Sequence, residues 1–344
     1  MHNFKKAMLA TAGFLICVIG IAAVIVWPYF TGQFYYYEDA AVRDDLAGSV
    51  DTILSGASHG YCAFDPNVMD EVLGTSSYNL SGPMMTMQAR STLLRKELDR
   101  NPVDTVFIEL SFNTLTRDRA EEGTEGDIYT LPRMGSLTEG IRYFFEAFAP
   151  EEYLSVCADT LDRGLQCWKD RYWGKGPQVD PSNRGFLRRD AQALSMGTEE
   201  FNQLFNTALI NEDALWENKE YLWEMVELCQ SRGIEVIFVT TPLSDKPLAE
   251  YTNLELPRQW YLYYAQQYGC QYLDFNLYRN RDTLFPDDTV FYDEFHLSKS
   301  GAEAFSRELA DLYTRLKNGE DLTPLFYGNY EEMKQAMYAS YNTP

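Results

Sequence analysis

Short apolar runs alternate with helically patterned stretches along most of the chain. The runs are rich in β-branched and aromatic residues, as in strands, whereas the stretches between them space their apolar side chains as one face of a helix does. Strands are expected at Val50–Leu54, Ser77–Leu80, Val103–Leu110, Ile234–Thr240 and Gln271–Phe275. Alternation of this kind predicts an α/β fold with a parallel sheet.

The predicted helices lie between and beyond these strands. They are expected at residues 67–73, 85–99, 217–233, 256–267 and 298–316, with one more near 330–341. A turn at Ser55–Gly60 follows the first strand. Residues from about 115 to 215 are too many for a structureless connection in a compact domain. They predict a mainly helical inserted subdomain or lid, with helices at 137–148 and 151–170.

A long apolar stretch precedes the first strand. No charged side chain occurs between residues 7 and 37, and residues 7–30 form a stretch of 24 mostly apolar residues. At about 1.5 Å per residue, a helix of that length reaches roughly 36 Å and can cross a hydrocarbon core of about 30 Å. Lys5 and Lys6 precede the stretch and acidic residues follow it. The positive-inside rule therefore places the N-terminus in the cytoplasm and the residues from about 38 onward outside the cell.

The competing interpretation of this stretch is a cleaved signal peptide. Such a peptide has a shorter apolar core followed by a small-residue cleavage site, whereas the aromatic stretch Tyr29–Tyr37 offers no such site. We therefore expect a single-pass anchor in the lipid bilayer. The expected plan is a cytoplasmic tail at 1–6, a transmembrane helix at 7–30, a juxtamembrane linker at 31–48, a main domain at 49–316 with its insertion at about 115–215, and a C-terminal tail at 317–344.

Composition narrows the classes of partner. The chain is 45% hydrophobic and 23% charged, which is typical of a globular protein and not of a disordered one. Its 29 basic and 51 acidic residues give a formal net charge of -22. Nucleic-acid affinity depends largely on basic side chains that displace counterions, so we expect no nucleic-acid partner.

The cysteines leave their pairing open. One lies in the apolar stretch and five lie beyond it, so the five cannot all pair with one another: Cys17, Cys62, Cys157, Cys167, Cys229 and Cys270. A bond between Cys157 and Cys167, or between Cys229 and Cys270, would close a small loop, and reduced buried thiols are the alternative. No CxxC pair or histidine cluster suggests zinc, and we expect neither a metal site nor a cofactor.

Histidines narrow the search for a general base. The chain has only His2, His59 and His296, and His2 lies on the cytoplasmic side of the predicted anchor. His296 ends the segment DEFH, which begins at Asp293 just before a predicted helix. An aspartate at this spacing can fold back onto the imidazole and accept a hydrogen bond from Nδ1. The other ring nitrogen, Nε2, is then free to take a proton.

The matching nucleophile is Ser58, in the segment GASHG directly after the first strand. Parallel sheets place their sites at the carboxyl ends of strands. The flanking glycines allow a tight turn and the close approach of a substrate. His59 cannot easily reach the Ser58 hydroxyl, so we expect it to line the pocket beside Gly56. Because this serine opens the domain and the DEFH segment closes it, the combination favours a Ser-His-Asp triad.

With these segments the chain resembles the SGNH/GDSL hydrolase superfamily, most closely its membrane-anchored extracytoplasmic members that acylate cell-envelope polymers. GASH is similar to the first family block, whose serine is the nucleophile, with Ala57 in place of the usual aspartate. NLSG, which ends at Gly82, is similar to the second block, whose glycine donates a backbone N–H to the oxyanion. SFNT stands where the third block falls, and only Asn113 matches it. DEFH and the following LSKSGA match the fifth block.

The resemblance covers roughly residues 50–316 outside the insertion. It implies a three-layer α/β/α fold around a mostly parallel, flavodoxin-like sheet of about five strands, with a catalytic domain at 49–316. It also implies a triad and an oxyanion hole, the first made of Ser58, Asp293 and His296 and the second of Ser58, Gly82 and Asn113.

The glycine spacing around Ser58 also fits the nucleophile elbow of α/β-hydrolases. That fold normally has several strands before its serine and a separate acid well before its histidine. Here the serine follows the first strand of the domain, and the acid lies three residues from the histidine. The SGNH pattern therefore fits better.

The expected chemistry is acyl transfer through an acyl-enzyme. Water as the acceptor makes an esterase, and a hydroxyl of a cell-envelope glycan or polymer makes an O-acyltransferase; the same triad serves both. The resemblance implies a multi-pass membrane acyltransferase as partner. The negative charge favours a neutral or amino-bearing acceptor over a polyanionic one. The alternative is a catalytically silent scaffold or glycan-binding protein of the same fold, which the imperfect third block favours and the intact triad opposes.

Overall fold

The computed structural model describes residues 2–30, 39–116, 123–173, 180–191, 212–250, 253–286 and 288–341. The chain divides into two compact units. The first, here called the N-terminal unit, comprises Met1–Asp45 and Asp127–Pro181, and the second, called the sheet unit, comprises Leu46–Gly126 and Ser182–Pro344.

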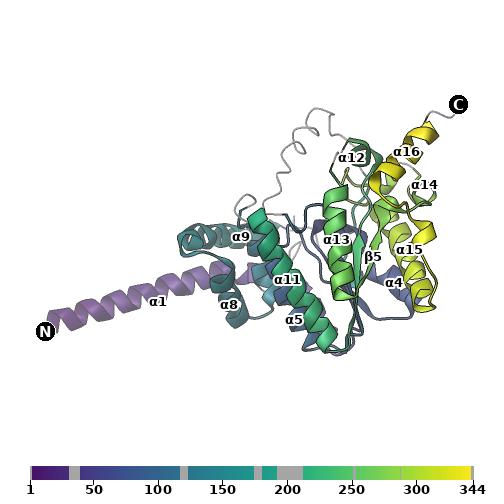
Figure 1. Ribbon diagram of the computed structural model, residues 1–344. Coiled ribbons are helices and arrows are strands. Elements are labelled where there is room, and N and C mark those ends of the chain that lie inside the picture. Colours follow the sequence, from purple (N-terminus) through teal and green to yellow (C-terminus); the bar gives the residue numbers. More distant parts are fainter. Residues whose placement is uncertain are drawn as a thin grey trace. The chain divides into compact units, whose positions relative to one another are not determined.

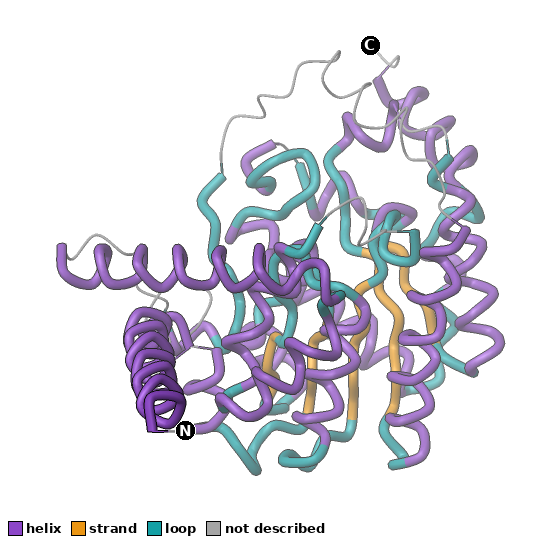
Figure 2. The backbone as a smooth tube through the Cα atoms, turned by 90° about the vertical axis from the view of Figure 1, so that its left-hand side faces the viewer, coloured by secondary structure: helices purple, strands orange, loops and turns teal. Residues whose placement is uncertain are grey.

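The sheet unit is built on five strands in the order β2-β1-β3-β4-β5 (Figure 2). The strands are β1 (Thr52–Ser55), β2 (Ser77–Asn79), β3 (Thr105–Glu109), β4 (Glu235–Thr240) and β5 (Gln271–Asp274). Every neighbouring pair is parallel. This is the flavodoxin-like strand order. It confirms the predicted α/β fold, including the number of strands.

Helices cover the sheet on both faces. They are α3 (Ser58–Ala63), α4 (Pro66–Leu73), α5 (Met87–Leu98), α11 (Glu212–Ser231), α12 (Asp245–Glu250), α13 (Glu255–Tyr268), α14 (Arg281–Leu284), α15 (Lys299–Lys317) and α16 (Tyr330–Tyr341). Helices α4 and α15 pack against each other, as do α5 and α11. In Figure 1, β5 lies between α13 on one side and α15 on the other.

The core explains why these segments form these elements. Phe107 of β3 and Ile237 of β4 are fully buried in one cluster with Phe305 of α15. Strands β3 and β4 are mostly apolar on both faces because each face of the sheet is covered by helices. Helix α11 ends where predicted, since Gly233 adopts a φ of 74°, a left-handed conformation that favours glycine.

One local prediction is wrong. The segment 55–60 was expected to be a turn, whereas β1 continues through Ser55 and a helix, α3, begins at Ser58. Helix α3 has only six residues, too few for a helical period to be visible in the sequence. All of its residues after Ser58 are buried. Tertiary packing, rather than local propensity, therefore forms this helix.

The N-terminal unit is helical in the part of it that the structure describes. Its α-helices are α1 (His2–Phe30), α2 (Asp39–Asp45), α7 (Glu125–Thr130, which begins at the boundary), α8 (Leu137–Ala147) and α9 (Tyr153–Trp173). The 3-10 helices are η1 (Leu131–Met134), η2 (Pro150–Glu152) and, across the second boundary, η3 (Pro181–Asn183). The two helices predicted for the insertion are thus present as α8 and α9.

Two predicted segments are only partly described. Residues 31–38 of the expected linker lie outside the described residues, as do residues 192–211 of the expected insertion. Phe4–Phe30 of α1 is long and apolar enough to cross a membrane. Length and composition alone do not separate a membrane span from a signal sequence.

Of the alternatives left open for the cysteines, the structure shows the reduced one, because all six cysteines are free. Cys157 and Cys167 lie on one helix, α9, where ten residues of rise separate them by about 15 Å, well beyond disulfide reach. Cys229 is buried at the end of α11, and Cys270 is half-buried before β5. Burial raises the pKa of the Cys229 thiol to about 12, so this thiol stays protonated at neutral pH.

Candidate active site

The strand order of the sheet reverses at β1. Strand β1 lies between β2 and β3. From β1 the chain first adds β2 on one side and then crosses back to add β3 on the other side. Ligands of open α/β sheets bind at such a reversal, outside the carboxyl ends of the strands. The segment after β1 carries Ser58, and the segment after β3 carries Asn113. Both predicted site segments therefore leave the sheet at this reversal.

The three predicted triad residues form one hydrogen-bonded chain. Nε2 of His296 lies 2.9 Å from Oγ of Ser58. On the other side of the ring, Nδ1 lies 2.9 Å from both carboxylate oxygens of Asp293. Because a carboxylate only accepts, this contact places the proton on Nδ1 and leaves Nε2 to accept the serine proton. The expected fold-back of the aspartate is thus observed, while the catalytic role of the three residues stays a prediction.

Asp293 is held by the backbone as well as by the ring. Its Oδ1 accepts hydrogen bonds from the backbone N–H groups of Phe295, at 2.8 Å, and His296, at 2.9 Å. Burial by itself would raise the pKa of this carboxyl, but the hydrogen bonds and the charge of the imidazole outweigh it and lower the pKa. The aspartate is therefore ionised and oriented at neutral pH.

The loop that carries His296 is closed from both ends. Phe291 and Leu297 pair across it in an antiparallel bridge. Ser298 then caps α15, its hydroxyl accepting from the backbone N–H of Gly301 at 3.4 Å. A Cβ on Gly301 would lie 2.0 Å from the carbonyl oxygen of Val290, so only glycine fits there. The LSKSGA segment thus turns the imidazole toward the sheet edge by capping and close packing.

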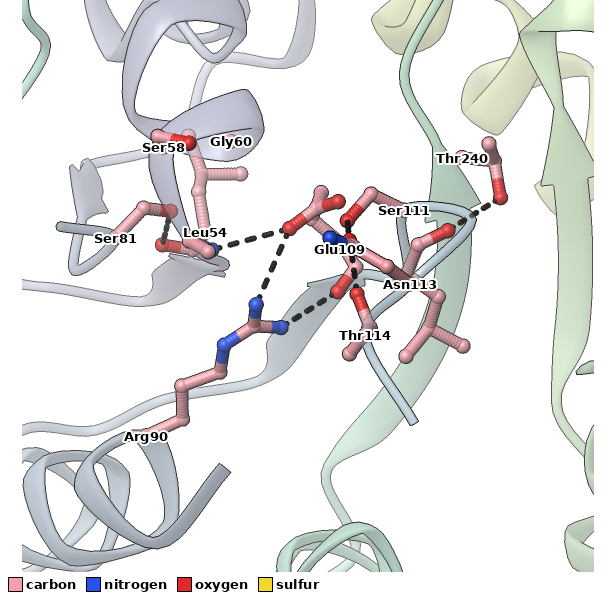
Figure 3. A network of polar contacts seen from close by, with 12 residues as sticks. Leu54, Ser58, Gly60, Ser81, Arg90, Glu109, Ser111, Asn113, Thr114 and Thr240 are labelled. Atoms are coloured by element: carbon pink, nitrogen blue, oxygen red, sulfur yellow. Dashed lines mark hydrogen bonds and ion pairs between the residues drawn. The ribbon is translucent and has the colours of Figure 1, made fainter. Parts of the chain in front are cut away.

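A buried ion pair lies beneath the nucleophile (Figure 3). Glu109, the last residue of β3, is fully buried, and its carboxylate accepts a hydrogen bond from the backbone N–H of Ala57 at 3.0 Å. Arg90 of α5, also buried, donates to the backbone carbonyl of Glu109 at 2.8 Å and lies 3.5 Å from its carboxylate. The pair therefore holds the residue directly before Ser58.

This pair was not found from the sequence. The only available signal was a glutamate at the end of an otherwise apolar strand, which is unusual because unpaired charges are rarely buried. The partner, Arg90, lies on a helix 19 residues away and looks like an ordinary surface arginine in sequence. Only the packing of α5 against the sheet joins them.

The two glycines around Ser58 serve close packing. A Cβ on Gly56 would lie 2.8 Å from Cβ of Glu109, and one on Gly60 would lie 2.8 Å from the hydroxyl of Ser81. Neither glycine has the positive φ that would demand glycine for backbone reasons. The expectation that they permit a tight turn is therefore replaced by a packing reason. That Gly56 lines a pocket stays a prediction.

The segment after β2 is tied to α3 by one side chain. The Asn79 amide donates to the backbone carbonyls of Gly60, at 3.0 Å, and Phe64, at 2.8 Å. Its oxygen accepts from the backbone N–H of Ser81 at 3.0 Å. This arrangement anchors the loop that reaches Gly82, which is buried. The oxyanion roles of the Gly82 and Ser58 amides stay predictions.

The segment after β3 is braced internally. The hydroxyl of Ser111 lies 3.2 Å from the side-chain oxygen of Asn113 and 2.9 Å from the hydroxyl of Thr114 (Figure 3). The buried hydroxyl of Tyr261 donates to the Ser111 carbonyl. These contacts fix the orientation of the Asn113 amide, whose contribution to an oxyanion hole stays a prediction.

His59 lies beside the triad imidazole. Its ring centroid is 4.9 Å from that of His296, and the aromatic rings of Phe112 and Phe295 lie 6.1 and 6.5 Å away. Phe112 and Phe295 also pack against an apolar cluster that includes Leu243. Aromatic side chains therefore line one side of the three predicted triad residues.

No metal centre is found among the residues that the structure describes. Within them, no group of three or more His, Cys, Asp or Glu side chains is placed to hold an ion.

No family model matches the chain, and no curated protein matches it in sequence. Some solved structures are similar to it. A putative acylhydrolase from Bacteroides fragilis is 12% identical and aligns over 81% of this chain and 94% of its own, with a TM-score of 0.39. A GDSL-like lipase from Bacteroides thetaiotaomicron is 12% identical over 82% of this chain and 98% of its own, with a TM-score of 0.40.

A third similar structure is an acetyl xylan esterase from Butyrivibrio proteoclasticus. It is 10% identical over 79% of this chain and 65% of its own, with a TM-score of 0.35. The α/β architecture described above rests on the strand order and register of the chain itself.

Proposed function

We propose that this protein is a membrane-anchored, serine-dependent acyl-transfer enzyme of the SGNH type. The observation that carries the proposal is the unbroken chain from the Ser58 hydroxyl through the His296 imidazole to the Asp293 carboxylate. These groups come from opposite ends of the sheet unit and meet at the strand reversal, where α/β proteins place their sites. A hydroxyl, base and orienting acid in this order are the parts of an activated nucleophile.

The mechanism follows from this geometry. As Ser58 Oγ attacks the carbonyl carbon of an ester or thioester, His296 Nε2 takes the serine proton. The tetrahedral intermediate collapses to an acyl-enzyme, and the imidazolium gives its proton to the departing alcohol or thiol. An acceptor hydroxyl then attacks the acyl-enzyme by the same steps in reverse. Asp293 keeps the imidazole oriented and stabilises its positive charge throughout.

The oxyanion of each intermediate is assigned to three donors. They are the backbone N–H groups of Ser58 and Gly82 and the side-chain amide of Asn113. Each well-placed donor contributes roughly 3 kcal/mol to transition-state stabilisation. The bracing of the Gly82 loop by Asn79 and of the Asn113 amide by Ser111 supports this assignment, because preorganised donors need no rearrangement during reaction.

The acceptor and the place of reaction follow from the anchor and the charge. Helix α1 is apolar and is exposed from residue 4 to residue 21, which is unfavourable in water and favourable in a bilayer. We place the N-terminus in the cytoplasm and the sheet unit outside the cell, where a neutral or amino-bearing cell-envelope glycan or polymer accepts the acyl group. A multi-pass membrane acyltransferase is the proposed source of that group.

The test is covalent labelling of the full-length chain in detergent with a fluorophosphonate, which reacts with activated serines. Ser58→Ala should abolish the labelling, and His296→Ala should reduce it strongly. Ser155→Ala, which removes an exposed hydroxyl of α9, should leave the labelling unchanged. Labelling that persists in Ser58→Ala, or an absence of labelling in the folded wild type, would overturn the proposal and favour the silent scaffold.

Esterase and transferase are separated by the fate of the acyl group. With p-nitrophenyl acetate as donor, a transferase releases p-nitrophenol faster when a neutral oligosaccharide is added, and mass spectrometry finds acetate on the sugar. An esterase shows no acceleration and releases only free acetate. A polyanionic oligosaccharide serves as the matched poor acceptor.

A further inference from the structure

The end of α1 is joined to α9 by an unusual contact. Pro28 lies inside α1 and has no N–H, so the carbonyl of Val24, four residues earlier, is denied its usual helical donor. The indole Nε1 of Trp168 donates to this carbonyl at 2.9 Å. A side chain of α9 thus supplies the hydrogen bond that proline removes from α1.

A glycine brings the two helices together at the same place. Gly164 lies one turn before Trp168 on α9, and a Cβ there would be 2.5 Å from the carbonyl oxygen of Ile25. The backbone of α9 therefore lies directly on the backbone of α1. In Figure 2, which looks along α1 from its N-terminal end, α9 runs across it.

Helix α9 also carries an exposed apolar stripe. Leu154, Leu161, Leu165 and Trp168 recur at intervals of seven, four and three residues, which places them on one face of the helix. Leu154 is 87% exposed, Leu165 43% and Trp168 39%. Trp168 belongs both to this stripe and to the contact with Val24, so the stripe borders α1.

The other solvent-facing side of α9 is polar. Asp159, Asp162, Gln166 and Lys169 are exposed there and share their own helix face. The helix is therefore amphipathic in addition to the side that it buries. Helix α8 of the same unit adds two exposed apolar residues one turn apart, Ile141 at 50% and Phe145 at 61%.

We propose that this apolar surface is embedded in the lipid bilayer at the level where α1 leaves it. The surface, called here the α8–α9 apolar face, consists of Ile141, Phe145, Leu154, Leu165 and Trp168. The proposal rests on the membrane anchor proposed above. Trp168, which belongs to the stripe, is hydrogen-bonded to Val24 of α1. A bilayer that surrounds α1 at this level therefore also contacts the stripe. An amphipathic helix that runs across a spanning helix lies in the plane of the interface, where tryptophan is favoured.

The contact between Trp168 and Val24 supports lipid as the occupant. A carbonyl that proline has left without its helical donor can be satisfied by water at a wet surface. In hydrocarbon it needs a donor from the protein, and neighbouring helices supply such donors around prolines of spanning helices. The neutral apolar composition of the face suits acyl chains, and the polar residues of α9, among them Asp159 and Asp162, lie on a separate side of the helix.

The test measures depth in the membrane, on the full-length chain in phosphatidylcholine nanodiscs. Single cysteines replace Leu154 and Phe145 in a background without the exposed Cys17 and Cys157, and each carries an NBD fluorophore. Gln166→Cys on the polar side of α9 is the matched control, and Ile16→Cys inside α1 reports the anchor. Fluorescence at 154 and 145 should shift to the blue and be quenched by doxyl-labelled lipid as at 16, with neither effect at 166.

The outcomes separate this proposal from the ones on which it rests. Quenching at 16 without quenching at 145 and 154 would overturn the embedded face and leave the anchor intact. No quenching at 16 would overturn both. Water-exposed probes in nanodiscs, combined with photo-crosslinking of 145 or 154 to a protein in native membranes, would assign the face to a protein partner instead. Fluorophosphonate labelling of the same samples tests the catalytic proposal independently.

Discussion

The sheet unit contains a buried ion pair beneath its candidate site, whereas the N-terminal unit exposes larger fractions of its apolar side chains. The sheet unit buries Glu109 completely and Arg90 almost completely, and both are hydrogen-bonded. The N-terminal unit exposes 87% of Leu154 and 61% of Phe145. Buried charge is tolerated only where partners compensate for lost hydration, and exposed apolar surface persists only where something other than water meets it. The proposed contact with the bilayer therefore concerns the N-terminal unit, and the proposed catalysis concerns the sheet unit.

The largest expected difference between the units comes from their ion pairs. Glu109→Gln leaves the buried guanidinium of Arg90 without a counter-charge, so we expect the free energy of unfolding to fall by about 3–5 kcal/mol. In the N-terminal unit, Glu146→Gln removes an exposed partner of Arg142 and should lower the free energy of unfolding far less, because water screens this pair. Urea denaturation of the full-length chain in detergent measures both. Equal effects would contradict the contrast between the units.

A second prediction concerns the pH dependence of the sheet unit. Burial raises the pKa of Asp274, at the end of β5, to about 6 from an ordinary 3.8. The folded state then holds this proton more tightly than the unfolded state does. Stability should therefore fall by about 3 kcal/mol as the pH rises from about 4 to about 6, and no further above that. In Asp274→Asn this fall should disappear from the unfolding free energies measured between pH 4 and 8.

Asp293 should give stability the opposite dependence on pH, in a lower pH range. The pKa of Asp293 is lowered, so its contribution is present above about pH 4 and is lost as the pH falls through its folded-state pKa. Asp293→Asn should remove that loss only. If the unfolding free energy of the Asp274→Asn variant still decreased between pH 4 and 6, a group other than Asp274 would cause that decrease.

A third prediction, with a smaller expected effect, concerns one closely packed glycine in each unit. Gly56→Ala forces a Cβ against the Glu109 side chain, which Arg90 prevents from moving. The free energy of unfolding should fall by about 1–3 kcal/mol, and the labelling of Ser58 should be lost. Gly164→Ala places a Cβ 2.5 Å from the backbone carbonyl oxygen of Ile25, so α9 and α1 must separate. A gain of about 1 kcal/mol in helix propensity offsets part of that cost, and Ser58 labelling should be unaffected. Gly13→Ala, with no neighbour within 4 Å, is the control.

The smallest effect concerns one hydrogen bond of the N-terminal unit. Trp168→Phe keeps an aromatic ring but removes the donor to the Val24 carbonyl, and should cost about 1 kcal/mol. Pro28→Ala restores the helical donor to the same carbonyl. A double-mutant cycle in nanodiscs should therefore show coupling, with the cost of Trp168→Phe shrinking in the Pro28→Ala background. Additive effects would mean that the indole does not replace the missing donor.

Most of the regular structure could be predicted from the sequence, because it depends on local periodicity. Residues 234–240 and 103–110 are apolar runs bounded by polar residues, and they form β4 and β3 with only their ends shifted. The hexapeptide helix α3 escaped prediction, since burial rather than propensity forms it. The pairing of cysteines could not be decided from spacing either, and only their placement in α9 excludes the first pair.

Within the site, the division follows distance along the chain. The contact of Asp293 with His296 spans three residues and could be predicted, because a loop this short has few ways to satisfy an aspartate next to an imidazole. Ser58 was predicted as the nucleophile from its place between two glycines directly after the first strand, and the family resemblance agrees with that prediction. The hydrogen bond from the Ala57 N–H to Glu109 could not be predicted from the sequence, because it depends on the pairing of β1 with β3.

What the sequence by itself determined was therefore local: the alternation of strands and helices, the apolar helix at the N-terminus and the aspartate–histidine segment. Tertiary structure alone brought Ser58 to His296 across 238 residues and set Trp168 against Val24 across 144. The physical reason is that periodicity and short-range hydrogen bonds act between neighbours in the chain. Contacts between distant residues are decided by how whole elements pack, after the entropy of closing the intervening chain has been overcome.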